Sequence, residues 1–195
     1  MFFYCLVLKK FSWALKLKRL ILTFKFLHLK VLLNSNQLQF TLKRLAYHLV
    51  EDYTSLQNVV FIGLQPRGTA VSDKIISLIQ AVLPHEPIQY GVLDITFYRD
   101  DIREELHKPA KTDINFSIEG KQVVLIDDVL HTGRTIRAAL DALNDFGRPS
   151  AVKLCVLVNR RFSRQLPIQP DYCGIAIDTS PTQKVKLNKQ TNEVE

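Results

Sequence analysis

The chain has 195 residues, of which 47% are hydrophobic and 23% are charged, a composition typical of one globular domain with a substantial core. The net charge of +7 lies in residues 1–30, which hold seven basic residues and no acid, so residues 31–195 carry no net charge. Global charge therefore gives no support for nucleic-acid binding, and the longest apolar run of the extension, Phe2 to Leu8, is too short to span a membrane.

Residues 1–30 form a basic, apolar extension that differs in composition from the rest of the chain. They lack glycine, proline and acids, and Lys9 and Lys10 follow the first apolar run, which is the reverse of a signal peptide. We favour a gene-prediction artefact upstream of a non-Met start near Leu29 or Val31, with a basic amphipathic membrane-surface helix as the alternative. The functional domain is predicted to span residues 31–187, followed by a polar, frayed tail at 188–195.

The three cysteines, Cys5, Cys155 and Cys173, show no spacing typical of a metal site or a disulfide framework. An odd count without a pairing pattern indicates a reducing compartment, and we expect a cytoplasmic protein. Cys155 lies in an apolar run and is predicted to be a small core residue.

From residue 34 onward, predicted helices and strands alternate. A first helix, capped by Ser35 or Asn36, carries apolar residues at helical spacing: Leu38, Leu42, Leu45, Leu49 and Val50. Strands are predicted at 58–64, 88–98, 123–126, 151–158 and 172–177, and further helices at 69–82 and from about 136 to Gly147. This alternation predicts an α/β fold with a twisted, mostly parallel sheet flanked by helices, so that the loops at the carboxyl ends of the strands converge. The polar stretch from Arg99 to about Asn115 is predicted to be a mobile loop.

The stretch at 123–135 organises the functional prediction. Four apolar residues predict a strand buried on both faces, which the carboxylates Asp127 and Asp128 are expected to end. A polar loop at 132–135 leads into a helix, and Gly133 lets the backbone approach a ligand closely. Backbone N–H groups at a helix N-terminus bind phosphate, and paired carboxylates accept hydrogen bonds from vicinal hydroxyls. A ribose 5-phosphate fits both halves, whereas the Walker and dinucleotide glycine patterns are absent.

These thirteen residues resemble the 5-phosphoribosyl-1-pyrophosphate (PRPP) motif of type I phosphoribosyltransferases: four apolar residues, two acids and Thr-Gly-x-Thr. The resemblance implies the fold of that family, with a small hood and a flexible loop. It also implies that Asp127 and Asp128 hold the ribose diol and help to place Mg²⁺. The 5-phosphate would be bound by Thr132, Gly133, Arg134 and Thr135.

The same resemblance assigns the pyrophosphate of PRPP to two further loops. The turn after the first strand consists of Gln65, Pro66, Arg67 and Gly68 and resembles the pyrophosphate loop of the family. That loop often contains a strained or cis peptide. Arg99 would close over the leaving group and act as a catalytic residue with Asp127 and Asp128. Because the transfer passes through an oxocarbenium-like state, positioning and charge neutralisation suffice and no protein nucleophile is required.

Longer segments narrow the resemblance to one family. Residues 62–68, 93–101, 132–143, 146–149 and 166–172 are similar to the PyrR pyrimidine operon regulators, and the similarity runs from about Asn34 to Leu187. It implies a uracil phosphoribosyltransferase that converts uracil and PRPP to UMP and diphosphate. It also implies binding to the leader of pyr mRNA that depends on UMP or UTP and causes transcription attenuation. Relatives form homodimers and homotetramers, so a homo-oligomer is expected.

One segment departs from the family pattern. The family often has Asp-Arg-Gly-His-Arg-Glu before Leu-Pro-Ile, whereas residues 159–165 are one residue longer and lack that histidine. This segment is expected near the base and the RNA. The base-binding candidates are Val158, Asn159, Arg160 and Tyr172. The family's basic RNA surface maps to Lys43, Arg44, Arg137, Arg160, Arg161 and Arg164.

A purine-type phosphoribosyltransferase, acting on hypoxanthine or guanine without an RNA role, is the alternative. Residues 170–174 faintly resemble the base-binding segment of that relative, in which an aromatic side chain stacks on the purine. Tyr172 would be the stacking residue in that case. Competition between uracil and hypoxanthine distinguishes the two hypotheses.

Overall fold

The structure is a computed structural model that describes residues 31–53, 55–99, 111–180 and 183–195. The expectations for residues 1–30, and for most of the predicted mobile loop after Arg99, lie outside the described residues. No helix in the described part of the chain is long and apolar enough to cross a membrane.

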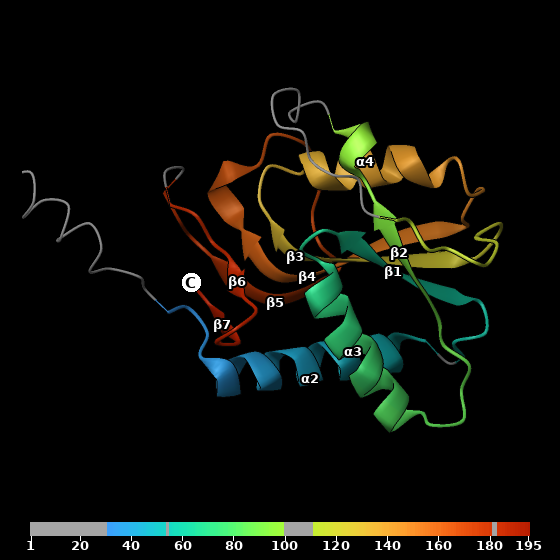
Figure 1. Cartoon of the computed structure of the whole chain (residues 1–195), viewed down its shortest axis with the longest axis horizontal. Helices are drawn as coiled ribbons and strands as arrows, with labels where there is room; N and C mark the ends of the chain where they lie inside the picture. The colour runs from blue at the N-terminus through green and yellow to red at the C-terminus, as the bar shows by residue number, and fades with distance from the viewer. Residues whose placement is uncertain (1–30, 54, 100–110, 181–182) are drawn as a thin grey trace, which may run out of the picture.

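A five-stranded parallel sheet forms the centre of the molecule (Figure 1). Its strands, in the spatial order β2-β1-β3-β4-β5, are β1 (Val59–Gln65), β2 (Gln89–Asp94), β3 (Gln122–Leu130), β4 (Ala151–Arg160) and β5 (Tyr172–Ile177). The helices α2 (Ser35–Asp52) and α3 (Thr69–Val82) cover one face, and α4 (Arg134–Leu143) covers the other. The predicted α/β fold is therefore confirmed.

The central strand β3 is buried on both faces. Val124 and Ile126 belong to the core beneath α2 and α3, whereas Val123 and Leu125 belong to the core beneath α4, and all four are fully buried. A side-chain period of two on a strand covered by helices on both sides produces this near-continuous apolar run. The strand is thus a rigid platform for the acids that it carries.

The N-cap of helix α2 lies one residue before the first predicted cap. The N-cap is Asn34, whose Oδ1 accepts a hydrogen bond from the backbone N–H of Gln37 at 2.9 Å. The Gln37 side chain in turn accepts one from the Asn34 N–H at 3.0 Å, which completes a capping box. The prediction of Ser35 or Asn36 was wrong because the glutamine three residues on pairs with Asn34.

The strand predicted at 88–98 ends four residues early. The Asp94 carboxylate accepts hydrogen bonds from the backbone N–H and the hydroxyl of Thr96, at 2.9 and 2.6 Å, and turns the chain into the short helix η1 (Thr96–Tyr98). An aspartate that bonds the backbone two residues ahead competes with strand pairing. The apolar residues after Asp94 therefore continue past the edge of the sheet.

The C-terminal tail is ordered rather than frayed as predicted. Strands β6 (Leu187–Asn188) and β7 (Glu193–Val194) form an antiparallel pair, and Val194 is fully buried. The backbone of Val194 exchanges hydrogen bonds with Leu33, at 2.9 and 3.3 Å, so the C-terminus lies beside the start of α2 (Figure 1). One apolar residue in a polar tail thus anchors the tail to the domain.

Candidate active site

The carboxyl ends of the parallel strands gather the predicted PRPP-binding residues at one edge of the sheet. The turn 65–68 follows β1, the acids lie near the end of β3, and the segment 159–165 continues from β4. Parallel strands place their carboxyl ends at the same edge, which is where open α/β sheets bind ligands.

The two acids lie within β3 and do not end it. Asp127 and Asp128 are 5% and 6% exposed, and pairing continues beyond them from Val129 to Val158 and from Leu130 to Asn159. Each carboxylate accepts a hydrogen bond from the backbone N–H of the next residue, at 2.9 and 2.8 Å. The prediction that they end the strand was wrong because β4 offers pairing partners on both sides of them.

Both acids have a raised pKa. Burial raises the pKa of the Asp127 carboxyl well above its usual value, the charge of Asp128 raises it further, and the Arg99 guanidinium opposes the rise. Burial also raises the pKa of Asp128, against the opposing charge of Arg67. Two buried carboxylates that the protein itself does not fully compensate are typical of a site that receives a cation or hydroxyl donors from a ligand.

The turn after β1 lies directly against the acids. The Gln65–Pro66 peptide bond is cis. A Cβ added to Gly68 would lie 2.7 Å from the carbonyl oxygens of Leu64 and Ile126 and 3.0 Å from the Cα of Asp127. Only glycine permits this approach, so the residue sets the distance between the predicted pyrophosphate loop and the carboxylates.

The predicted 5-phosphate loop opens onto a helix N-terminus. Gly133 has φ +93°, a left-handed conformation that favours glycine, and α4 begins at the next residue. The Thr132 hydroxyl accepts a hydrogen bond from the Arg134 N–H at 3.4 Å. Arg99 reaches the same loop, with its guanidinium 3.5 Å from the Thr135 hydroxyl. Backbone N–H groups at the start of α4 and nearby cations make this loop suitable for a phosphate.

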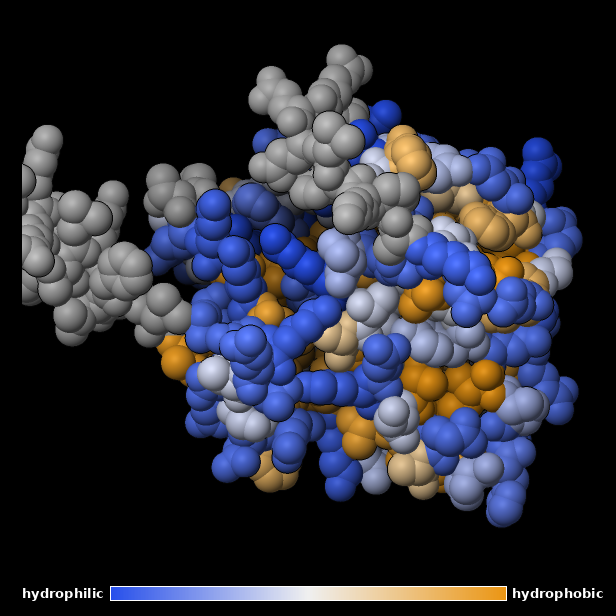
Figure 2. Space-filling model, viewed as in Figure 1, coloured by the Kyte–Doolittle hydropathy of each residue, from blue (hydrophilic) through white to orange (hydrophobic). Residues whose placement is uncertain are grey.

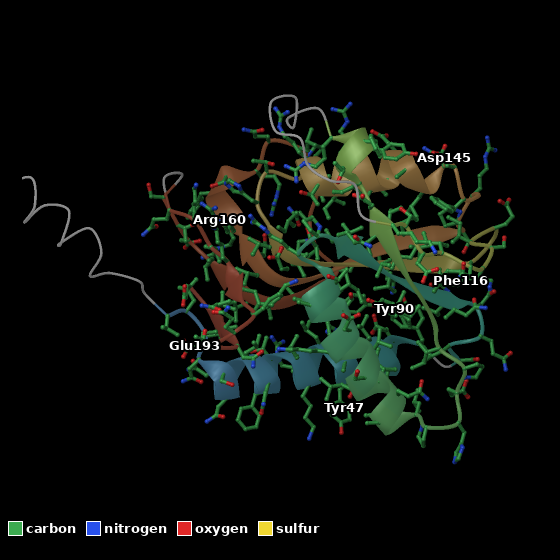
Figure 3. The ribbon with its side chains drawn as sticks, viewed as in Figure 1. Tyr47, Tyr90, Phe116, Asp145, Arg160 and Glu193 are labelled. Atoms are coloured by element: carbon green, nitrogen blue, oxygen red, sulfur yellow. The ribbon has the colours of Figure 1, made fainter. Side chains whose placement is uncertain are left out.

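Residues 161–168, which we call the hood, follow β4 and begin with the short helix η2 (Arg161–Ser163). Asn159, at the end of β4, is half-buried beneath this segment and pairs with Leu130 of β3. Arg160 is 4% exposed and donates to the Thr179 hydroxyl at 2.7 Å and the Ser180 carbonyl at 3.1 Å (Figure 3). Of these two base-binding candidates, Asn159 is the more accessible.

The other two base-binding candidates belong to the core. The Val158 side chain is fully buried in the core beneath α2, which leaves only its backbone for a ligand. Tyr172 is 1% exposed, its hydroxyl donates to Asp52 at 2.7 Å, and its ring meets His48 edge-on at 5.0 Å. The prediction that Tyr172 contacts a base was wrong, because α2 covers the ring. The residue that prompted the purine alternative is therefore a core residue.

The candidate RNA-binding residues do not form one surface. Lys43 and Arg44 lie on α2, whereas Arg137 lies on α4 at the opposite face of the sheet and pairs with Asp141. Arg161 forms two hydrogen bonds with Asp178, at 2.7 and 2.6 Å, and so is held at the end of β5. The face seen in Figure 2 is mostly hydrophilic, interrupted by patches of hydrophobic residues.

Two contacts at this edge were not predicted from the sequence, one that involves Asp178 and one between the hood and the 5-phosphate loop. Asp178 follows β5 as Asp127 follows the apolar run of β3, and that repeated pattern of strand and acid was an available signal. Gln165 and Leu166 donate backbone hydrogen bonds to the Thr132 carbonyl, at 3.0 and 3.2 Å. No local pattern indicates a contact between segments more than 30 residues apart.

The described residues contain no cluster of three or more metal-ligating acids, histidines or cysteines. Asp127 and Asp128 nevertheless fit a Mg²⁺ ion that takes most of its ligands from elsewhere, because magnesium sites commonly use one or two carboxylates together with substrate phosphates. Their raised pKa values fit this arrangement, since a divalent cation stabilises the ionised form.

Comparisons with known proteins agree with this geometry. A family model described as "Phosphoribosyl transferase domain" matches residues 28–189. The chain is 44% identical over 160 residues to the "Bifunctional protein PyrR" of Picosynechococcus sp., covering 82% of this chain and 89% of the relative. It is 43% identical over 163 residues to the protein of that name from Actinobacillus pleuropneumoniae, covering 83% of this chain and 90% of the relative.

Solved structures show the same fold. A hypoxanthine phosphoribosyltransferase from Staphylococcus aureus superimposes with a TM-score of 0.66 at 22% identity, covering 85% of this chain and 90% of that one. A hypoxanthine-guanine phosphoribosyltransferase from Bacillus anthracis gives a TM-score of 0.65 at 20% identity, covering 84% of this chain and 94% of that one. Likeness at this level of identity concerns the fold and leaves the base undecided.

Proposed function

The chain belongs to the PyrR family of phosphoribosyltransferases, and on that premise we propose that it transfers the phosphoribosyl group of PRPP to uracil. The products are UMP and diphosphate. We propose further that the protein binds the leader of pyr mRNA when UMP or UTP is bound, and thereby attenuates transcription. The observation that carries the proposal is the buried pair Asp127 and Asp128, set between a phosphate loop and a glycine turn in a chain 44% identical to a PyrR protein.

Each part of PRPP has a counterpart at the site. The 5-phosphate accepts hydrogen bonds from the backbone of 132–135 and the first turn of α4. The pyrophosphate lies along the turn 65–68, and Arg67 and Arg99 balance its charge. The charge of Arg67 opposes the raised pKa of Asp128 and that of Arg99 opposes the raised pKa of Asp127, which supports a shared role for the two arginines.

The carboxylates serve the ribose and the metal. Asp127 and Asp128 accept hydrogen bonds from the ribose hydroxyls and would hold Mg²⁺, which would supply positive charge to the leaving diphosphate. Their burial keeps water from the ribose C1 as positive charge develops there. The base approaches from the hood, with Asn159 as its side-chain contact and the backbone near Val158 beside it.

Base specificity is the decisive test of the enzyme proposal. Purified protein with PRPP and Mg²⁺ should form UMP from uracil, and an equimolar mixture of uracil and hypoxanthine should yield mainly UMP, measured by chromatography of the nucleotides. Formation of IMP with no UMP would establish the purine alternative. Removal of Mg²⁺ with a chelator should abolish either product, because the pyrophosphate would leave without a counter-charge.

We propose that RNA binds on the side of the sheet that bears α2. Lys43 and Arg44 lie there with the exposed aromatic Tyr47, which points away from the sheet (Figure 3). Arg44 also donates to the Cys173 and Gly174 carbonyls of β5, which joins the helix to that edge. We propose that a homodimer or homotetramer presents this surface in the cytoplasm, where the free thiols Cys155 and Cys173 remain reduced.

Binding to pyr leader RNA should strengthen with UMP and weaken as salt rises, because each phosphate contact releases a counterion. Lys43→Gln should reduce the slope of log affinity against log salt by about one, the value expected for a single lost phosphate contact. Arg137→Gln, on the opposite face, should leave the slope unchanged. Filter binding across a salt series measures both, and equal slopes for all three proteins would contradict this surface.

A further inference from the structure

The hood is fastened to the 5-phosphate loop by several hydrogen bonds. Gln165 and Leu166 donate their backbone N–H groups to the Thr132 carbonyl, and the Arg134 guanidinium donates to the Gln165 side chain at 2.9 Å. A Cβ on Gly133 would lie 3.3 Å from the Leu166 side chain, so the two segments are also in close contact. The phosphate loop and the hood therefore hold each other in place.

One side chain extends this connection to the end of β4. Arg164 donates to the His131 carbonyl, in the chain just before the phosphate loop, and to the Asn159 Oδ1 at 2.6 Å. A guanidinium is planar and presents its donors in a fixed fork, so the two contacts fix the relative positions of their acceptors. Arg164 is half-buried, and this burial lowers the pKa of its guanidinium.

The contact with Arg164 decides what Asn159 offers to a ligand. A carboxamide has one acceptor oxygen and a nitrogen with two donors. Because Arg164 holds the oxygen, the amide is oriented with its nitrogen as the group left to donate. Carbonyl oxygens accept such a bond, and both uracil and hypoxanthine carry them.

We propose that Arg164 is a positioning residue that couples the 5-phosphate loop to the base site, by anchoring the loop at His131 and orienting the Asn159 amide toward a base carbonyl. The inference rests on the proposed phosphoribosyl transfer and assigns Arg164 a role in the reaction in place of the RNA contact predicted from the sequence. A base then binds best when the phosphate loop is ordered by PRPP. Loss of Arg164 therefore weakens the binding of the base more than the binding of PRPP.

A double-mutant cycle tests this coupling. Steady-state kcat and both KM values are measured for the wild type, Arg164→Gln, Arg164→Lys, Asn159→Ala and the double variant Arg164→Gln/Asn159→Ala. Arg164→Gln should raise the KM for uracil about tenfold, the loss expected for one charge-assisted hydrogen bond, and the KM for PRPP less than about threefold. In the Asn159→Ala background the same change should raise the KM for uracil less than about twofold, because its target is gone.

Arg164→Lys should recover part of the uracil affinity, since one ammonium donor replaces the fork. The matched control is Arg148→Gln, an exposed arginine after α4, which should leave both KM values unchanged. The inference would be overturned if the effects of Arg164→Gln and Asn159→Ala on the KM for uracil simply multiplied in the double variant. It would also be overturned if Arg164→Gln raised the KM values for uracil and PRPP equally. A fall in kcat and melting temperature with no change in the KM for uracil would overturn it as well.

The cycle also separates this inference from the proposed function. If the wild type makes IMP and no UMP, the uracil proposal fails, and the same cycle is run with hypoxanthine, whose carbonyl an amide nitrogen recognises in the same way. Coupling between Arg164 and Asn159 with either base supports the inference, and its absence with the base that reacts contradicts it.

Discussion

Asp128→Asn is expected to lower kcat by about 100-fold, since it removes a charge that stabilises the transition state. The same variant should remain folded. The amide oxygen of asparagine still accepts the hydrogen bond from the Val129 N–H, so the local geometry of β3 persists. The loss of turnover comes from weaker stabilisation of the positive charge that develops on the ribose in the transition state. Initial rates at saturating uracil and PRPP measure it, and Asp141→Asn, an exposed carboxylate on α4, is the control.

The stability of Asp128→Asn should change in the opposite direction to its activity. The pKa of Asp128 in the folded protein is raised above the ordinary aspartate value of 3.8, so the folded protein binds more protons than the unfolded chain between those two values. Stability of the wild type therefore falls as pH rises through this window, and the cost persists at neutral pH. Asparagine carries no charge and avoids the cost, so the variant should be more stable at pH 7.

Urea unfolding from pH 4 to 8 provides the test. The difference in unfolding free energy between Asp128→Asn and the wild type should grow with pH through the raised pKa of Asp128 and then level off. A variant that is less stable than the wild type at pH 7 would show that Asp128 is compensated within the protein. In that case the carboxylate would have a structural role, and its burial would not be an adaptation to a ligand.

Much of the fold was predictable because its signals are local. Helix α3 at 69–82 and strand β5 at 172–177 have the predicted bounds, since their apolar periods stop at clear turn residues. The acids of β3 were identified as a pair, but the sequence placed them at the end of the strand. Whether a strand continues through a polar residue depends on its neighbour in the sheet, and the pairing of Val129 with Val158 is not encoded locally.

The sequence says least about residues whose surroundings come from distant segments. Tyr172 is an aromatic residue in a motif that resembles a base-binding segment, yet α2 lies over it and Asp52 accepts a hydrogen bond from its hydroxyl. Arg164 was predicted, from the resemblance, to belong to the basic RNA surface of the family. Its contacts with Asn159 and the His131 carbonyl depend on how the hood folds back over β3 and β4. Neither the cover over Tyr172 nor the contacts of Arg164 can be predicted from composition and residue spacing.

Gly68→Ala should damage the site through the backbone rather than through a lost functional group. The added Cβ would lie 2.7 Å from two carbonyl oxygens, and backbone on both sides leaves no flexible side chain to yield. The turn 65–68 must then move away from Asp127. A displacement of about 1 Å in a positioning element typically costs about 100-fold in rate, and we expect that loss in kcat/KM for PRPP. Overpacking of this kind should also lower stability by about 1–3 kcal/mol.

The appropriate comparison for Gly68→Ala is Gly120→Ala. Gly120 has φ +68° and no atom within 4 Å of an added Cβ, and it precedes β3 at the end of the sheet opposite the acids. Alanine there should cost about 1 kcal/mol through backbone conformation alone and leave kcat/KM unchanged. Because both variants lose stability, only the kinetics distinguish a close approach required by the site from a general need for glycine. Equal kcat/KM values for the two variants would show that the close approach at Gly68 is not needed for activity. A loss of kcat/KM confined to Gly68→Ala would show that this contact sets the distance between the pyrophosphate loop and Asp127.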